Sequence, residues 1–318
     1  MKRILKILGI VIGVIVLAIA AFAVYVGASD IPSYENNAPE MNVQLTPERV
    51  EEGARIASML CSSCHRSDDR KLGGNHMVDA SDFGEIHSPN ITQHPEYGIN
   101  DYTDGELAYL FRTGIKKDGQ YAPPYMPKFP HMSDEDIASI IAFLRSDHPL
   151  VQPSNKATEP CKPNFIAKLL SRVAFKPLPY PDGPIVAPPP TNKVKFGEYA
   201  ATAKFDCYQC HSADFKTNNS LEPSLSLGFF GGGNPIPDLE GNRIISANLT
   251  MDEATGLGSW TEEEFVKAVK MGIRPDGTAA RYPMLPYSQM TDEEATAIWA
   301  YLKTLPVIEN QALVAEAE

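Results

Sequence analysis

The stretches Cys61-Ser62-Ser63-Cys64-His65 and Cys207-Tyr208-Gln209-Cys210-His211 repeat one motif, in which a histidine directly follows two cysteines three positions apart. Residues three apart lie on one side of a helical turn, so both thiols can reach the same flat group. The motif is typical of haem c attachment, in which the thiols bond to the haem vinyl groups and the histidine binds the iron. It predicts two covalently bound haem c groups, attached at Cys61, Cys64, Cys207 and Cys210, with His65 and His211 as proximal ligands.

Paired Cys-x-x-Cys motifs also occur in four-thiolate zinc sites, and single ones occur in thioredoxin-like redox proteins. Zinc sites usually hold their cysteine pairs about 15–20 residues apart. Here Cys61 and Cys207 are 146 positions apart, and a histidine follows both pairs. The spacing therefore favours haem over zinc.

An uncharged run of 22 residues, 7–28, follows the basic residues Lys2, Arg3 and Lys6. About 20 apolar residues are enough to cross a bilayer, and basic residues before the run keep that end in the cytoplasm. The run predicts a membrane anchor over residues 1–28, in the bacterial cytoplasmic membrane, with the soluble domains on the periplasmic side, where haem c is attached. A cleaved signal peptide is the alternative, since Val26-Gly27-Ala28 would suit signal peptidase.

An internal repeat organises the rest of the chain. Residues from Asn90 onward align without a gap with those from Asn248, at an offset of 158, whereas the cysteine motifs are offset by 146. The second repeat therefore carries 12 extra residues between His211 and Asn248, in a stretch that includes Gly231-Gly232-Gly233. A phosphate-binding loop is disfavoured there, because no Gly-Lys-Ser/Thr follows.

Helix start signals recur in both repeats. Thr46-Pro47 combines a cap residue with proline at the first helical position, which predicts a helix running into Cys61. Four later helices are predicted to begin at Thr103…Glu106, Ser133…Asp136, Thr261…Glu264 and Thr291…Glu294. The last helix of each repeat has one apolar face, formed by Ile137, Ile140, Ile141 and Leu144 and by Ala295, Ile298, Trp299 and Leu302.

These signals predict a mainly α protein with two tandem cytochrome c-like domains after an N-terminal transmembrane helix. The predicted boundaries are 1–28 for the anchor, 45–150 and 196–308 for the two domains, 151–195 for a Pro-rich linker, and 309–318 for a tail. A short apolar helix is expected within the linker at 164–175. This helix could pack between the two domains, dock on a partner, or bind the membrane.

The sixth iron ligand separates electron transfer from catalysis, because methionine sulfur raises the potential and closes the iron to substrate. Two matched pairs exist, Met126 with Met284 and Met132 with Met290. The second pair directly precedes helix caps, where an apolar residue usually packs on the first turn. Met126 and Met284 lie in proline-flanked loops, which limit the entropy lost on holding a weak ligand. They are the predicted distal ligands.

Histidine alternatives differ between the repeats. No histidine follows His211, so the second haem has no local bis-histidine option, whereas the first motif has several nearby: His76, His87, His94 and His131. The matched residues Asn90 and Asn248 could hydrogen-bond haem propionates or hold loops. Cys161 remains outside both motifs, and a buried or inert thiol is favoured over an intermolecular bridge or a ligand role.

Several segments of the second repeat resemble a known family. Ser246-Ala247-Asn248-Leu249-Thr250, the run from Asp252 to Thr261, Tyr282-Pro283-Met284-Leu285-Pro286-Tyr287 and Thr304-Leu305-Pro306 are similar to the cytochrome c subunit of membrane-bound alcohol, aldehyde and gluconate dehydrogenases. The resemblance implies a periplasmic multihaem subunit that takes electrons from a dehydrogenase and passes them to quinone or a terminal oxidase. That family commonly has three haem motifs, and this chain has two.

The function expected is a membrane-anchored dihaem cytochrome c that relays single electrons without catalytic residues of its own. A dihaem peroxidase-like enzyme is the alternative, and it needs one iron open to substrate. Expected partners are a dehydrogenase subunit, a respiratory complex or a soluble cytochrome, together with the membrane and without nucleic acid. The net charge of −12 becomes −15 once Lys2, Arg3 and Lys6 are excluded, which serves solubility or steers a basic partner.

Overall fold

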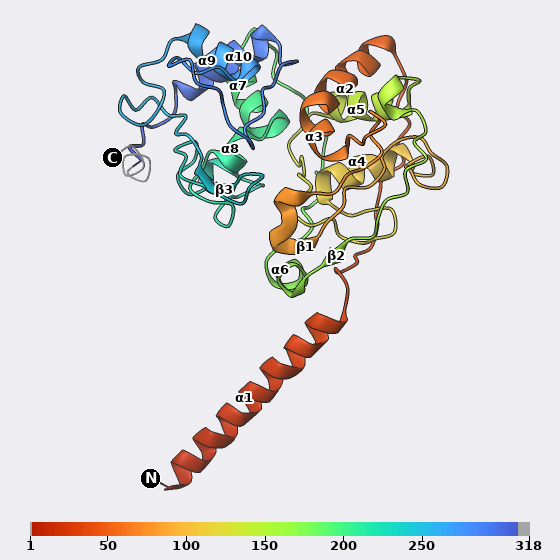
Figure 1. Ribbon diagram of the computed structural model, residues 1–318, viewed down its shortest axis with the longest axis vertical. Helices are drawn as coiled ribbons and strands as arrows, with labels where there is room; N and C mark the ends of the chain where they lie inside the picture. Colours follow the sequence, from red (N-terminus) through yellow and green to blue (C-terminus); the bar gives the residue numbers. More distant parts are fainter. Residues whose placement is uncertain (1, 311–318) are drawn as a thin grey trace.

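The computed structural model describes residues 2–310, and shows one long helix projecting from a helical body made of two units (Figure 1). The long helix is α1 (Lys2–Ala28). Among the described residues, α1 is the one helix whose length and composition would allow it to cross a membrane, and its apolar stretch is not buried in the protein. Of the predicted tail, residues 311–318 lie outside the described part of the chain.

The first unit contains the helices α2 (Pro47–Leu60), α3 (Ser62–His65), α4 (Asp104–Thr113) and α5 (Asp134–Arg145), with the short turns η1 (Val78–Phe83) and η2 (Pro149–Val151). Its core lies where α2 crosses α5. Gly53 makes this crossing possible, because a Cβ there would lie 1.8 Å from the carbonyl oxygen of Ser139. The predicted apolar face of α5 is fully buried in this core.

The second unit repeats this arrangement. It contains α7 (Lys193–Tyr199), the π-helical turn η3 (Ala200–Lys204), α8 (Cys207–Cys210), η4 (Pro223–Leu225), a two-stranded antiparallel sheet of β3 (Pro235–Pro237) and β4 (Arg243–Ile245), and then α9 (Glu262–Met271) and α10 (Asp292–Leu302). Gly197 marks the crossing of α7 and α10, since a Cβ there would lie 1.9 Å from the carbonyl oxygen of Ala297. The predicted apolar face of α10 is buried here.

The first helices of the two units differ by two residues. Gly53 precedes Cys61 by eight positions, whereas Gly197 precedes Cys207 by ten. In the second unit the path between these points includes the π-helical turn η3, which uses more residues per turn than an α-helix. The extra residues are thus absorbed without moving the cysteine motif away from the crossing.

The predicted helix starts are confirmed. Thr46 caps α2, and its hydroxyl accepts a hydrogen bond from the backbone N–H of Arg49. Helices α4, α9 and α10 begin with reciprocal capping boxes, and Ser133 caps α5 through its hydroxyl alone. The mainly helical fold class predicted from the sequence is therefore confirmed.

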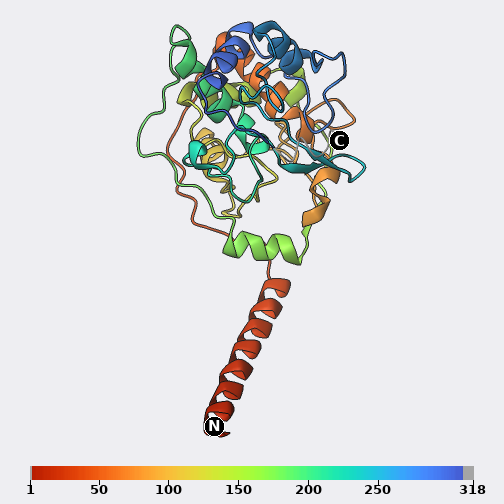
Figure 2. The ribbon, with the colours of Figure 1, turned by 90° about the vertical axis from the view of Figure 1, so that its left-hand side faces the viewer.

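The predicted linker helix forms as α6 (Phe165–Val173), just after β2 (Lys162–Pro163), which pairs with β1 (Gly84–Glu85) of the first unit. It lies crosswise at the end of α1, below the first unit (Figure 2). The adjacent Cys161 is exposed, and its sulfur contacts the backbone of His87. Cys161 is therefore not buried, because the β1–β2 pairing holds this segment on the surface, and its inert role stays a prediction.

The two units pack on each other through a buried ionic cluster. The ammonium of Lys204 in η3 lies 2.8 Å from a carboxylate oxygen of Glu52, 3.1 Å from one of Asp136 and 3.0 Å from one of Glu294. Arg55 forms hydrogen bonds of 2.7 Å with both Glu52 and Glu294. Lys204 is only 4% exposed and Glu294 only 2%, so the cluster is largely shielded from water and links α2 and α5 to η3 and α10.

The cluster reflects the internal repeat. Arg55 and Tyr199 each follow the crossing glycine of their own unit by two positions, and Asp136 and Glu294 are matched by the repeat offset. Arg55 binds Glu294, and the hydroxyl of Tyr199 donates a hydrogen bond to Asp136. Matched positions therefore pair crosswise between the units, as expected for two similar halves related by an approximate two-fold axis.

Candidate functional site

Each cysteine motif directly follows the helix that crosses the unit core. Cys61 caps the end of α2, and α3 carries the rest of the first motif. In the second unit Asp206, with a left-handed backbone (φ 54°), turns the chain from η3 into α8. Burial raises the pKa of Cys61 and Cys207 to about 12, so both thiols are neutral and packed beside the cores.

The two motif histidines have the same environment. The Nδ1 atom of His65 lies 2.8 Å from the carbonyl oxygen of Pro89, and that of His211 lies 2.8 Å from the carbonyl oxygen of Ala247. A backbone carbonyl can only accept, so Nδ1 carries the proton and Nε2 keeps its lone pair. Burial lowers the pKa of both imidazoles, which keeps them neutral. This is the tautomer and charge state that an iron ligand needs.

Two matched glycines hold the histidine backbones. The N–H of Gly74 donates to the carbonyl of His65 at 2.9 Å, and the N–H of Gly232 donates to that of His211 at 3.0 Å. Both glycines have positive φ, and a Cβ at either would come within 2.5 Å of a backbone oxygen. Part of the triple-glycine stretch therefore supports the second motif, and the 12 extra residues fall between His211 and Gly232.

Asn90 and Asn248 hold loops. The amide nitrogen of Asn90 donates to the carbonyls of Ser154 and Lys156, and that of Asn248 donates to the carbonyl of Ile308. Each side-chain oxygen accepts hydrogen bonds from the threonine two positions later. Both amides therefore hold in place the loop just before them, in which Pro89 or Ala247 supplies the carbonyl partner of the motif histidine.

The four matched methionines separate into two environments. Met132 and Met290 are fully buried in the two unit cores, where they pack as apolar residues. Met126 and Met284 lie in half-buried loops. Met284 and Cys207 pack against the same apolar cluster of the second unit. Tyr125, next to Met126, packs with Cys64 against a second apolar cluster in the first unit. The loops carrying the predicted distal ligands therefore border the cysteine motifs.

Lys128 was not predicted, and it fastens the Met126 loop. Its ammonium donates hydrogen bonds to the carbonyl oxygens of Pro123 at 2.7 Å and Met126 at 2.8 Å. The ammonium also lies 5.0 Å from the ring centre of Tyr121. Burial lowers the pKa of Lys128 well below its ordinary value. The repeat-matched residue is Pro286, which gave no sequence signal for a cation at this place.

Replacing Lys128 by leucine should loosen the Met126 loop. The change removes two hydrogen bonds to loop carbonyls, each worth about 0.5–1.5 kcal/mol. We expect weaker sulfur ligation at the first site, seen as a reduced methionine charge-transfer band in the oxidised spectrum. Lys117→Leu is the matched control, since Lys117 pairs with Asp101 at the surface of the same unit. An unchanged band in Lys128→Leu would show that the loop holds its shape without the lysine.

The methionine loop of the second unit makes a direct contact with the first unit. The hydroxyl of Tyr282, two positions before Met284, donates to a carboxylate oxygen of Asp79 at 2.6 Å. Asp79 belongs to η1, and Cys64 packs against the apolar cluster of Met77, Ala80 and Ile86 beside this turn. The methionine loop of the second unit therefore contacts the segment that borders the first cysteine motif.

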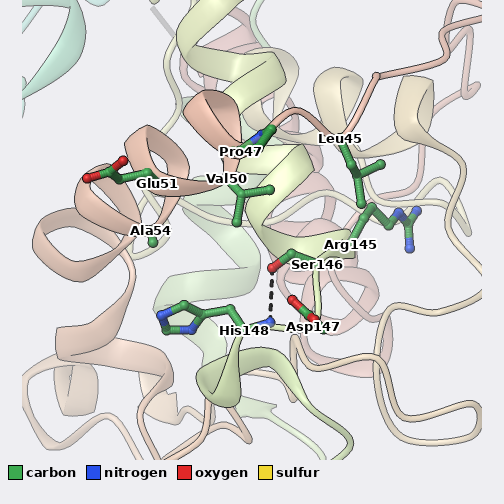
Figure 3. Close-up of a pocket in the computed structure, with 9 residues that line it drawn as sticks. All are labelled: Leu45, Pro47, Val50, Glu51, Ala54, Arg145, Ser146, Asp147 and His148. Carbon is green, nitrogen blue, oxygen red and sulfur yellow. Dashed lines mark hydrogen bonds between the residues drawn. The ribbon is translucent and has the colours of Figure 1, made fainter.

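A separate groove lies at the start of α2 and the end of α5 (Figure 3). The backbone N–H of His148 donates to the hydroxyl of Ser146 at 3.2 Å on its wall. None of the predicted haem residues lines the groove, whose walls are formed by Leu45, Pro47, Val50, Glu51, Ala54, Arg145, Ser146, Asp147 and His148. The groove is thus distinct from both candidate haem sites.

Comparison with known proteins agrees with this geometry. The family model described as cytochrome c matches residues 50–147 and 198–306. The chain is 31% identical to the cytochrome c subunit of a quinone-dependent alcohol dehydrogenase from Gluconacetobacter polyoxogenes, over 81% of this chain and 56% of that protein. It is 27% identical to a gluconate 2-dehydrogenase cytochrome c subunit from Pantoea cypripedii, over 77% of this chain and 56% of that protein.

A shorter relative matches nearly end to end. The chain is 28% identical to a dihaem cytochrome c-type protein of Cereibacter sphaeroides, over 85% of this chain and 90% of that protein. By contrast, the chain spans only about half the length of the dehydrogenase subunits. The two matched segments each contain one cysteine motif and its histidine. The chain therefore belongs to the cytochrome c family, with two cytochrome c segments joined by a linker.

Proposed function

We propose that the chain is a membrane-anchored, periplasmic dihaem cytochrome c that relays single electrons from a dehydrogenase or respiratory complex to a downstream acceptor. The contact between Tyr282 and Asp79 carries this proposal, because it joins the second methionine loop to the segment beside Cys64. The buried ionic cluster around Lys204 fixes the two units in this arrangement. Two redox sites held close together are what a relay requires.

The residues have simple roles in such a relay. Haem c, once bound, supplies reversible one-electron chemistry at its iron. Cys61, Cys64, Cys207 and Cys210 hold the two groups, and Nε2 of His65 and of His211 is free to bind iron. Met126 and Met284 would also bind the irons, which would leave no position open to a substrate. The chain then performs no bond chemistry, and it serves as an electron-transfer subunit.

The names of the relatives and the net charge of the chain indicate the class of its partners. Relatives of this chain are named as cytochrome subunits of alcohol, fructose and gluconate dehydrogenases, which supports a dehydrogenase as electron donor. Residues 29–318 carry a net charge of −15. A charge of this size steers a basic partner surface toward the protein.

Carbon monoxide tests the relay directly. We expect the holoprotein purified from membranes to contain two haem c groups per chain, both low-spin, with a reduced spectrum that carbon monoxide leaves unchanged. The reason is that Met126 and Met284, as iron ligands, would leave no position open to carbon monoxide. A dehydrogenase subunit should copurify with it. A high-spin haem that binds carbon monoxide and turns over hydrogen peroxide would instead support a dihaem peroxidase-like enzyme.

A further inference from the structure

Helix α6 leaves an apolar stripe uncovered. Phe165, Leu169 and Val173 recur at every fourth position, so they line one face of the helix, and Ile166 lies beside them. Phe165 is 44% exposed, Ile166 54% and Val173 58%, and Leu169 between them is half-buried. Such a stripe is costly in water unless another apolar phase covers it.

The opposite face of α6 is already used. Ala167 and Ser171 are buried, and α6 packs against η1 and the end of α1. Asn164 caps the helix, with its side-chain oxygen accepting from the N–H of Ala167. The apolar stripe is therefore the free side of a helix that is held in place by its other side.

The basic side of α6 is fastened to the end of α1. The ammonium of Lys168 donates to the carbonyl of Gly27 at 3.2 Å, and the guanidinium of Arg172 donates to the hydroxyl of Ser29 at 2.6 Å. The guanidinium also lies 5.5 Å from the ring centre of Tyr25. Figure 2 shows the result, with α6 lying across the end of α1 and the whole body on its other side. This is the level at which an anchor helix leaves the bilayer.

The charge of this segment differs from that of the chain. Residues 164–176 contain no acidic residue and three basic ones, Lys168, Arg172 and Lys176, in a chain with a net charge of −12. Basic residues flanking an apolar face are typical of helices that lie in the membrane interface, where anionic headgroups attract them. Both the shape and the charge of α6 therefore fit a lipid surface.

We propose that α6 is an interfacial helix whose Phe165–Leu169–Val173 stripe inserts between the headgroups of the membrane that α1 spans. This inference rests on the anchor role of α1 in the proposed function. The membrane then contacts the protein twice, and the body can no longer rotate freely about α1. A membrane partner would meet one fixed face of the protein.

That face is connected to the first candidate haem site. The ring of Phe175, just beyond α6, lies 6.4 Å from that of Phe83, which lies 5.9 Å from that of Tyr125, beside Met126. Seating α6 in the interface therefore turns the Met126 loop of the first unit toward the membrane.

Spin-label depth measurements test the inference on the full-length holoprotein in nanodiscs of phosphatidylcholine and phosphatidylglycerol. Cys161→Ser removes the cysteine outside the haem motifs, and Ile166→Cys or Val173→Cys then accepts a nitroxide. We expect both labels to favour collisions with oxygen over a water-soluble nickel complex, at a depth of about 5–10 Å. Val186→Cys, at an apolar linker position that is 82% exposed, is the matched control and should favour nickel.

A label at Ile15→Cys in α1 separates this inference from the anchor. If the Ile15 label is deep in the bilayer while the α6 labels are as accessible to nickel as the Val186 label, the interfacial helix is refuted and the anchor stands. If the Ile15 label is also in water, the anchor itself fails, and the interfacial helix with it. Labels on α6 that both reagents fail to reach would mean that protein covers the stripe, which also overturns the inference. The haem spectrum confirms folding in each variant.

Discussion

Met284→Ala should abolish about half of the methionine charge-transfer band of the oxidised holoprotein and lower one of its two reduction potentials. Methionine sulfur raises the potential of a haem iron, so its loss lowers the potential of the second site alone. No histidine follows His211 in the sequence, so no histidine from the second repeat can replace the lost methionine. Visible spectra and a potentiometric titration measure both effects.

Met290→Leu is the decisive control for this prediction. Met290 is fully buried in the second core, and leucine conserves its volume, so the change should cost less than about 1.5 kcal/mol and leave the band intact. Met271→Ala, at an exposed position in the same unit, should be silent. A band that survives Met284→Ala but disappears in Met290→Leu would reverse the ligand assignment. The same comparison applies to Met126 and Met132 in the first unit.

Much of the fold could be predicted because its signals are local. Caps such as Thr103 and Thr291 act within one helical turn, and the apolar faces of α5 and α10 are visible as sequence periodicity. The mainly helical class, the N-terminal apolar helix and the cytochrome c resemblance are confirmed by the structure and the family comparison. The exact domain boundaries stay predictions.

The site was predictable where chemistry fixes the spacing. The cysteine and histidine positions are predicted from the spacing that haem c attachment requires, and their role stays a prediction. The structure adds the carbonyl partners that orient His65 and His211. Those partners come from backbone atoms of Pro89 and Ala247, which no side-chain pattern can reveal. Lys128 was missed for a related reason, because it bonds to carbonyls and has no counterpart in the second repeat.

Contacts between distant segments were beyond the reach of the sequence pattern. Lys204 and Glu52 are 152 positions apart, and each looks like an ordinary surface residue of an amphipathic helix. Their burial depends on how two finished units dock. The sequence likewise left three alternatives for the linker helix, and its position beside α1 depends on the β1–β2 pairing and on Arg172.

Lys204→Met should destabilise the folded protein by about 3–5 kcal/mol, because it leaves three carboxylates in a buried cluster with one remaining cation, Arg55. Urea unfolding of the full-length holoprotein in detergent, followed by circular dichroism and haem absorbance, measures the effect. In Lys204→Met we also expect the two units to unfold in separate steps, because the cluster that joins them in the wild type is disrupted. Lys270→Met removes an exposed pair with Asp292 and should cost less than about 1 kcal/mol.

The difference in unfolding free energy between the wild type and Lys204→Met should depend on pH, and this dependence identifies its cause. Burial alone would raise the pKa of Glu52, but hydrogen bonds from Arg55 and the charge of Lys204 lower it to about 2, and the pKa of Glu294 is lowered by the same two cations. Carboxyl groups with lowered pKa stabilise the protein above their ordinary pKa near 4.5, and this stabilisation is lost as pH falls toward 2. The difference between the wild type and Lys204→Met should therefore be full at pH 7 and shrink below about pH 4.5. A difference that stays constant down to pH 3 would mean that Lys204 acts through packing of its side chain and not through its charge.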